Sequence, residues 1–156
     1  MSWKKLTRII APVLGATALA GACEDATSIE EHLEVGGFAI VAGETETYRY
    51  VVTDNAPAEL VLAPGAHDVA FVLLDADGQP LEESGDEDHE HELRITIDDE
   101  TVLTWTPEEH THAAEHVEFH GVLSGVEAGN TMMDVCIPHG SHCDFEVANV
   151  PVQVSP

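Results

Sequence analysis

Basic side chains are scarce in this sequence of 156 residues, which has 5 Lys and Arg against 30 Asp and Glu. Three of the five, Lys4, Lys5 and Arg8, lie within the first eight residues. From residue 23 on, all 30 acidic residues remain with only Arg49 and Arg94, which gives a net formal charge of −28. Because contacts to phosphate require Lys and Arg, this charge excludes a nucleic-acid-binding protein and docking of the protein's own surface on anionic lipid.

Long helical patterns and catalytic motifs are lacking as well. No long segment repeats its apolar residues with a period of 3.6, and no Ser-His-Asp order, glycine-rich phosphate loop or paired-carboxylate cleft stands out. The stretch from His112 to His116 has the H-x-x-E-H spacing of inverted zinc proteases. A protease also needs a distant third ligand and a large cleft, for which this chain is too short and too rich in strands. We therefore expect no enzyme.

The first 31 residues have the composition of an export signal and a tether. Residues 1–8 are basic, and residues 9–22 are apolar but too few to cross a bilayer as a helix. The sequence LAGAC at 19–23 resembles a bacterial lipobox, which implies that Cys23 becomes the lipidated first residue. We expect a signal peptide at 1–22, an acidic tether at 23–31 and one domain at 32–156. The protein is then held at a bacterial membrane of the cell envelope by its N-terminal lipid alone.

Alternating apolar residues, broken by Gly, Pro and Asp, predict an all-β protein. Many short strands at near-regular spacing indicate an antiparallel β-sandwich, and we expect Val102, Leu103 or Trp105 to meet Val117 and Phe119 in its core. The predicted strands are Leu33–Val41, Glu46–Val52, Ala58–Leu62, Asp68–Leu74, Glu92–Ile97, Thr101–Thr106, His116–Leu123, Thr131–Ile137 and Phe145–Val154.

Three segments of the second half resemble the bacterial immunoglobulin-like domain, group 2. They are TVLTW at 101–105, GVLSGVEAGNT at 121–131 and VPVQV at 150–154, so the resemblance covers roughly residues 58–154. It implies an immunoglobulin-like sandwich on an exported protein, and no single activity. The chain departs from this family in two loops rich in His and acidic residues, at 82–91 and 107–115.

The segment CIPHGSHC at 136–143 places two cysteines on either side of a predicted turn. In an oxidising compartment we expect Cys136 and Cys143 to form a disulfide across the hairpin. The alternative is a Cys2His2 metal site in which both thiolates bind an ion together with His139 and His142. In either case Gly140 permits a sharp bend that holds the two histidines close together.

The ten histidines outnumber the basic residues two to one, and their placement predicts a metal site. In an antiparallel meander successive connections lie at alternate ends, so 82–91, 107–115 and 138–143 share one end, opposite the turns at 98–100 and 124–130. The first three connections contain six histidines and the two turns none. The predicted ligands are His89, His91, His110, His112, His116, His120, His139 and His142, with a carboxylate such as Glu115 or Glu118.

The favoured interpretation is an envelope lipoprotein that captures, buffers or hands over a transition metal ion, zinc or copper, to a metal transporter or another envelope protein. Because imidazole binds metal only when neutral, affinity should fall steeply below about pH 6. The alternative is a structural or adhesive immunoglobulin-like surface module whose histidines are ordinary polar residues.

Overall fold

Nine strands form the part of the chain that the computed structural model describes, namely residues 34–54, 56–82, 92–108 and 116–156. Each lies where the alternation of apolar residues predicts one, with ends shifted by a few residues. They are β1 (Gly37–Ala42), β2 (Thr45–Val51), β3 (Leu60–Leu62), β4 (Gly65–Leu74), β5 (Arg94–Ile97), β6 (Leu103–Pro107), β7 (Glu118–Gly125), β8 (Gly129–His139) and β9 (His142–Val154).

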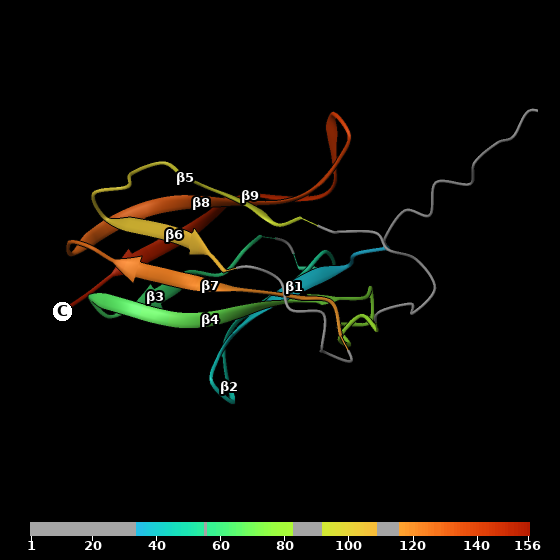
Figure 1. Ribbon diagram of the computed structural model, residues 1–156, viewed down its shortest axis with the longest axis horizontal. Helices are drawn as coiled ribbons and strands as arrows, with labels where there is room; N and C mark the ends of the chain where they lie inside the picture. Colours follow the sequence, from blue (N-terminus) through green and yellow to red (C-terminus); the bar gives the residue numbers. More distant parts are fainter. Residues whose placement is uncertain (1–33, 55, 83–91, 109–115) are drawn as a thin grey trace, which may run out of the picture. The chain divides into compact units, whose positions relative to one another are not determined.

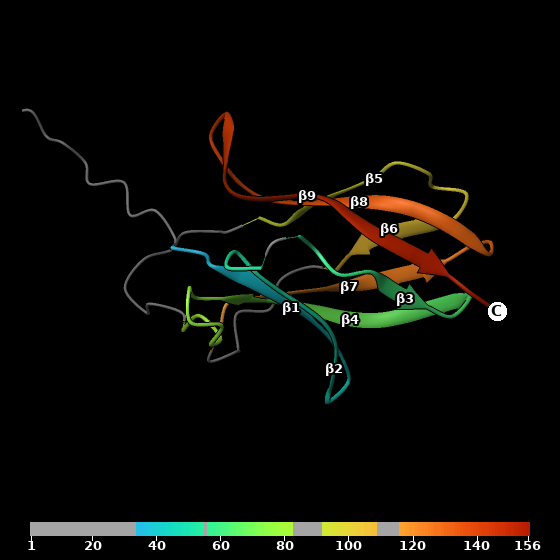
Figure 2. The ribbon, with the colours of Figure 1, turned by 180° about the vertical axis from the view of Figure 1, so that it is seen from behind.

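The strands form two sheets that face each other, as Figures 1 and 2 show from opposite sides. The five-stranded sheet has the order β2-β1-β4-β7-β6, and the four-stranded sheet has the order β3-β9-β8-β5. All pairs are antiparallel except β3 and β9, which run parallel from Leu60↔Val152 to Leu62↔Val154. This parallel edge was not predicted, because it arises where β3 crosses from the first sheet to the second. The predicted all-β sandwich is confirmed.

The core lies between the two sheets and is built from alternate residues of their strands. In β7 and β8 buried and more exposed positions alternate along most of the strand, because successive side chains point to opposite faces. The predicted core positions are confirmed: Leu103 and Phe119 are buried, and the Trp105 ring packs edge-on against Phe71 with centroids 5.2 Å apart. Gly121 is required under this ring, since a Cβ atom there would overlap Trp105.

The two ends of the sandwich differ in structure. At one end hydrogen bonds join the turn after β5 to the turn after β7 and to β8: Val126 N donates to Val102 O at 2.9 Å, and Asp99 N donates to Thr131 Oγ1 at 3.0 Å. At the other end β8 and β9 extend as a hairpin beyond β5, whose first residue Arg94 pairs with Cys136. On this side of the sandwich β5 begins at Arg94, β6 ends at Pro107 and β7 begins at Glu118.

Several predictions lie outside the described residues. The export signal, the tether and the lipidation of Cys23 fall within residues 1–33, and residues 83–91 and 109–115 of the two long loops are outside as well. Among the residues that the structure does describe, no helix is long and apolar enough to cross a membrane.

Candidate metal centre

The tip of the β8–β9 hairpin places two histidines side by side. The turn consists of Gly140 and Ser141, and Gly140 has a φ of +58°, a conformation that glycine adopts without strain. His139 and His142 are directly paired across the ladder, so their side chains lie on the same face. Their ring centroids are 5.6 Å apart.

A β-bulge next to the turn brings a carboxylate to the same histidines. Ile137 pairs with Phe145 and Pro138 with Cys143, so Asp144 is an extra residue at this step of the ladder. Pro138 has no N–H to donate to the ladder, and proline in a sheet is found at such irregularities. Asp144 Oδ2 lies 3.3 Å from His139 Nδ1, and Asp144 Oδ1 lies 3.1 Å from His142 Nε2.

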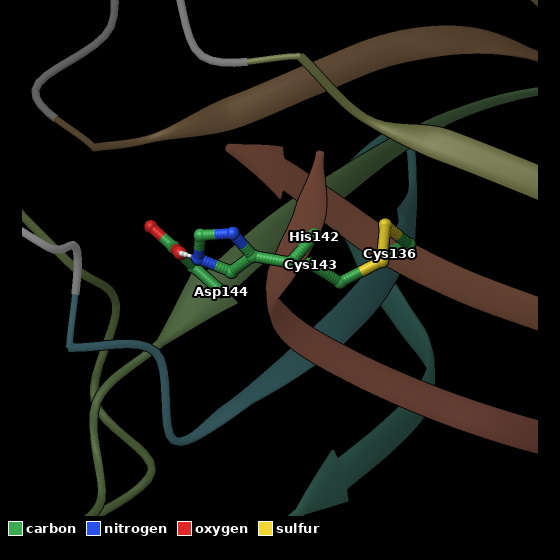
Figure 3. The surroundings of a disulfide bond; sticks show 4 residues. All are labelled: Cys136, His142, Cys143 and Asp144. Atoms are coloured by element: carbon green, nitrogen blue, oxygen red, sulfur yellow. Dashed lines mark ion pairs between the residues drawn. A yellow bond between two sulfur atoms is a disulfide. The ribbon is translucent and has the colours of Figure 1, made fainter. Parts of the chain in front are cut away.

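A disulfide between Cys136 and Cys143 closes the hairpin, with their Cα atoms 5.6 Å apart. The predicted pairing is confirmed. In Figure 3 the two sulfur atoms lie to one side of the hairpin, while the His142 ring and Asp144 lie to the other. Because the sulfurs are bonded to each other and point away from the imidazole, the Cys2His2 alternative is not what the structure shows.

The geometry of this group suits a metal ion bound by two nitrogens and one oxygen. One candidate ligand atom from each of His139, His142 and Asp144 lies within 4.8 Å of the others. Ligands of a tetrahedral ion at roughly 2.0–2.1 Å lie about 3.3 Å apart. Each imidazole nitrogen lies near this distance from a different oxygen of Asp144, at 3.3 Å for His139 and 3.1 Å for His142. The Asp144 side chain is 11% exposed, that of His139 38% and that of His142 60%. Asp144 is thus the most buried member of the group, and His142 is the most exposed.

The other described histidines do not join this group. His120 Nε2 lies 2.8 Å from Glu118 Oε1 on the exposed face of β7, and His120 also lines a cavity of ≈ 210 Å³ together with Glu108 and Trp105. His116 Nδ1 is buried and has no hydrogen-bond partner among the described residues, and the remote His67 Nε2 lies 2.8 Å from Ala63 O. Within the described ranges, no other set of three His, Cys, Asp or Glu residues has its ligand atoms as close together.

Five of the predicted site residues are outside the described residues, and their convergence stays a prediction. They are His89, His91, His110, His112 and Glu115.

One member of the group, Asp144, was not predicted from the sequence. The carboxylates predicted there were Glu115 or Glu118. A signal for Asp144 was present, since His142 and Asp144 are two residues apart and such a pair on a strand shares a face. Its approach to His139 depends on the turn and the bulge, which this spacing alone does not specify.

No protein-family model matches the chain, and no curated protein matches it at a significant level. The resemblance to the bacterial immunoglobulin-like domain, group 2, is therefore not confirmed. Among solved structures, the chain is similar to domains 4 and 5 of the S-layer protein SbsC, with 20% identity and a TM-score of 0.38, over 66% of this chain and about half (49%) of that one. It is also similar to the ZirS C-terminal domain, with 14% identity and a TM-score of 0.37, over 99% of this chain and 97% of that one. Likeness at these TM-scores supports no argument about function.

Proposed function

We propose that this protein binds one divalent transition metal ion at the tip of the β8–β9 hairpin, through His139, His142 and Asp144. The observation that carries the proposal is the convergence of two imidazole nitrogens and one carboxylate within 4.8 Å on a hairpin closed by a disulfide. An imidazole pair with one carboxylate is a donor set that zinc accepts in proteins, and imidazole also suits copper.

The donor set favours a divalent ion over copper(I). Copper(I) prefers thiolate and thioether sulfur, and both hairpin cysteines are in the disulfide. Met132 and Met133 lie in the part of β8 that is remote from the hairpin tip, where Asp98 N donates to Met132 O. Met133 is also fully buried in the core. Zinc and copper(II) are therefore the ions for which we expect the highest affinity.

The charge of the protein supports capture of cations. Only two basic residues lie beyond the N-terminal segment, and one of them, Arg49, forms an ion pair with Glu46 in which Nη2 and Oε2 are 2.6 Å apart. Arg49 Nη1 also donates a hydrogen bond to Gly78 O at 2.6 Å. The acidic surface is thus little neutralised, and a field of this sign raises the local concentration of cations. Together with the expected lipid anchor at Cys23, this supports a role in capturing, buffering or handing over metal at a bacterial envelope, with a transporter or another envelope protein as receiver.

A structural or adhesive surface module is the alternative, and one observation favours it. Ion pairs between Asp144 and protonated His139 and His142 would stabilise the hairpin without any metal, because both imidazoles already lie within 3.3 Å of the carboxylate. In that case the hairpin is a rigid projection for contact with other molecules.

Calorimetry separates the two functions. The exported protein carrying Cys23→Ser, which prevents lipidation, is titrated with zinc and with copper(II) at neutral pH. We expect one ion to bind the hairpin, and His139→Ala/His142→Ala to weaken binding by more than about 100-fold, since loss of even an outer-shell partner costs 10- to 100-fold. His67→Ala is the matched control, because His67 is a described histidine distant from the group. Binding by the double variant as tight as that of the wild type would rule out the metal site.

A further inference from the structure

A cavity of ≈ 210 Å³ lies at one side of the sandwich, where β6, an edge strand of the first sheet, contacts β5, an edge strand of the second. Its apolar lining includes Leu93, Trp105 and Phe119, which belong to or pack against the core. Two exposed carboxylates, Glu92 and Glu108, also line it. Apolar walls beside exposed carboxylates suit a side chain with an apolar stem and a cationic end.

A second cavity, of ≈ 240 Å³, repeats this combination next to the first. Glu108 and His120 line both cavities, so the two adjoin at these residues. The second cavity lies over a row of paired residues that crosses three strands of the five-stranded sheet, from Val41 to Ala70 and from Ala70 to His120. Exposed Asp68 lines it as well, so each cavity has a carboxylate of its own in addition to Glu108.

The first cavity also offers a hydrogen-bond donor. Trp105 Nε1 is buried and has no hydrogen-bond partner among the described residues. An indole N–H can only donate, and an ammonium group has no acceptor to offer it. A residue of a polypeptide carries a carbonyl oxygen close to its side chain, whereas an inorganic cation or an aliphatic amine does not. The donor therefore favours a cationic side chain on a peptide backbone over a free cation.

The charge of the whole protein favours the same ligand. With a net formal charge of −28 beyond residue 22, the protein attracts basic partners and speeds their association. Lysine combines four methylene groups with a terminal ammonium, which matches the apolar walls and the carboxylates of each cavity. In an extended segment, side chains two residues apart lie on one face about 7 Å from each other, so two lysines can enter adjoining cavities.

We propose that the two cavities form a docking site for a partner protein and take two lysine side chains of an extended segment of that partner. One ammonium group binds Glu92 and Glu108, and the other binds Asp68. A carbonyl oxygen of the segment accepts a hydrogen bond from Trp105 Nε1. The site involves none of the hairpin residues 139–144, so it does not depend on the proposed metal ion.

NMR tests the docking site through its own indole. Protein carrying Trp3→Phe and Cys23→Ser keeps Trp105 as its one tryptophan and has no lipidation site. It is titrated at low salt with a capped pentapeptide of glycine that has lysine at its second and fourth positions. The resonance of the Trp105 indole N–H should shift until the peptide saturates the site. The same peptide with both lysines acetylated keeps its carbonyl groups but loses its charge, and should leave the resonance in place.

Two glutamates make a matched pair of variants. Glu108→Gln and Glu127→Gln remove the same charge from exposed positions, but only Glu108 lines the cavities. Glu108→Gln should weaken binding of the lysine peptide by at least about 3-fold, and Glu127→Gln by less than about 1.5-fold.

Three results would overturn the docking site while leaving the metal-binding function intact. Equal losses in the two variants would mean that the peptide is attracted by the acidic surface in general. Peptide binding without a shift of the indole resonance would place the peptide elsewhere. Spermidine that shifts the resonance as much as the peptide, at an equal concentration, would show that a free polyamine suffices and that no protein segment is recognised.

Discussion

Two regions of this fold bring histidine against a carboxylate, and they do so by different means. On β7, Glu118 and His120 are two residues apart on one strand and share a face, so a single contact of 2.8 Å results. At the β8–β9 tip, the turn pairs His139 with His142, and the bulge adds Asp144 at 3.3 and 3.1 Å from them. Alternation along one strand thus yields a pair, whereas a set of three donors requires a turn and a bulge together.

The disulfide exists at only one of these regions, and its removal should have the largest effect. By the chain-entropy estimate, closing a loop of this size stabilises the protein by about 2.5 kcal/mol, so Cys136→Ala/Cys143→Ala should lower the free energy of unfolding by that amount. The turn becomes less fixed, and zinc affinity should fall as well. Urea unfolding and calorimetry measure the two effects. Unchanged zinc affinity in a destabilised variant would show that the disulfide does not support the metal centre.

The two carboxylates form a matched pair for substitution. Asp144→Asn should weaken zinc binding by about 10-fold or more, because the amide keeps the shape of the side chain but loses the charge that binds the ion. Glu118→Gln makes the same chemical change beside His120 and should leave the affinity as it is. Calorimetry on both variants checks the contrast, which fails if the two substitutions have equal effects.

The turn glycine has an equivalent elsewhere in the fold. Gly140 and Gly43 have φ values of +58° and +61°, and at neither would a Cβ atom meet another atom within 4 Å. Gly140→Ala and Gly43→Ala should each lower the free energy of unfolding by about 1 kcal/mol through backbone strain alone. Only Gly140→Ala should also weaken zinc binding, because it alone alters the turn between the ligands. Equal zinc affinities of the two variants would show that zinc binding does not depend on the conformation of the turn.

The smallest effect is expected at His120. It forms an exposed contact with Glu118, and such pairs contribute little because solvent screens them, so His120→Ala should change the free energy of unfolding by less than about 0.5 kcal/mol. Zinc affinity should be unchanged, because His120 does not belong to the described group of three. A loss of affinity comparable with that of Asp144→Asn would instead show that His120 on β7 takes part in the metal centre, as the sequence predicted.

The sequence predicts the strands well and the site only in part. All nine strands and the pairing of Cys136 with Cys143 follow from alternation, turn residues and redox chemistry. The neighbouring positions of His139 and His142 follow from the short turn between them. The parallel pairing of β3 with β9 does not, because a crossover between sheets leaves no periodic signal. The contact of Asp144 with His139 does not either, because it depends on a one-residue register shift in the β8–β9 pairing that residue spacing alone does not specify.

The most direct test of the account is a nitrogen NMR spectrum of the imidazole rings, recorded on the exported Cys23→Ser protein with and without one equivalent of zinc. The account predicts that the resonances of His139 Nδ1 and His142 Nε2 shift to values typical of metal-bound nitrogen, since these are the atoms that face Asp144. The resonances of His67 and His120 should stay in place. Zinc-dependent shifts confined to other histidines, with His139 and His142 unchanged, would contradict the account.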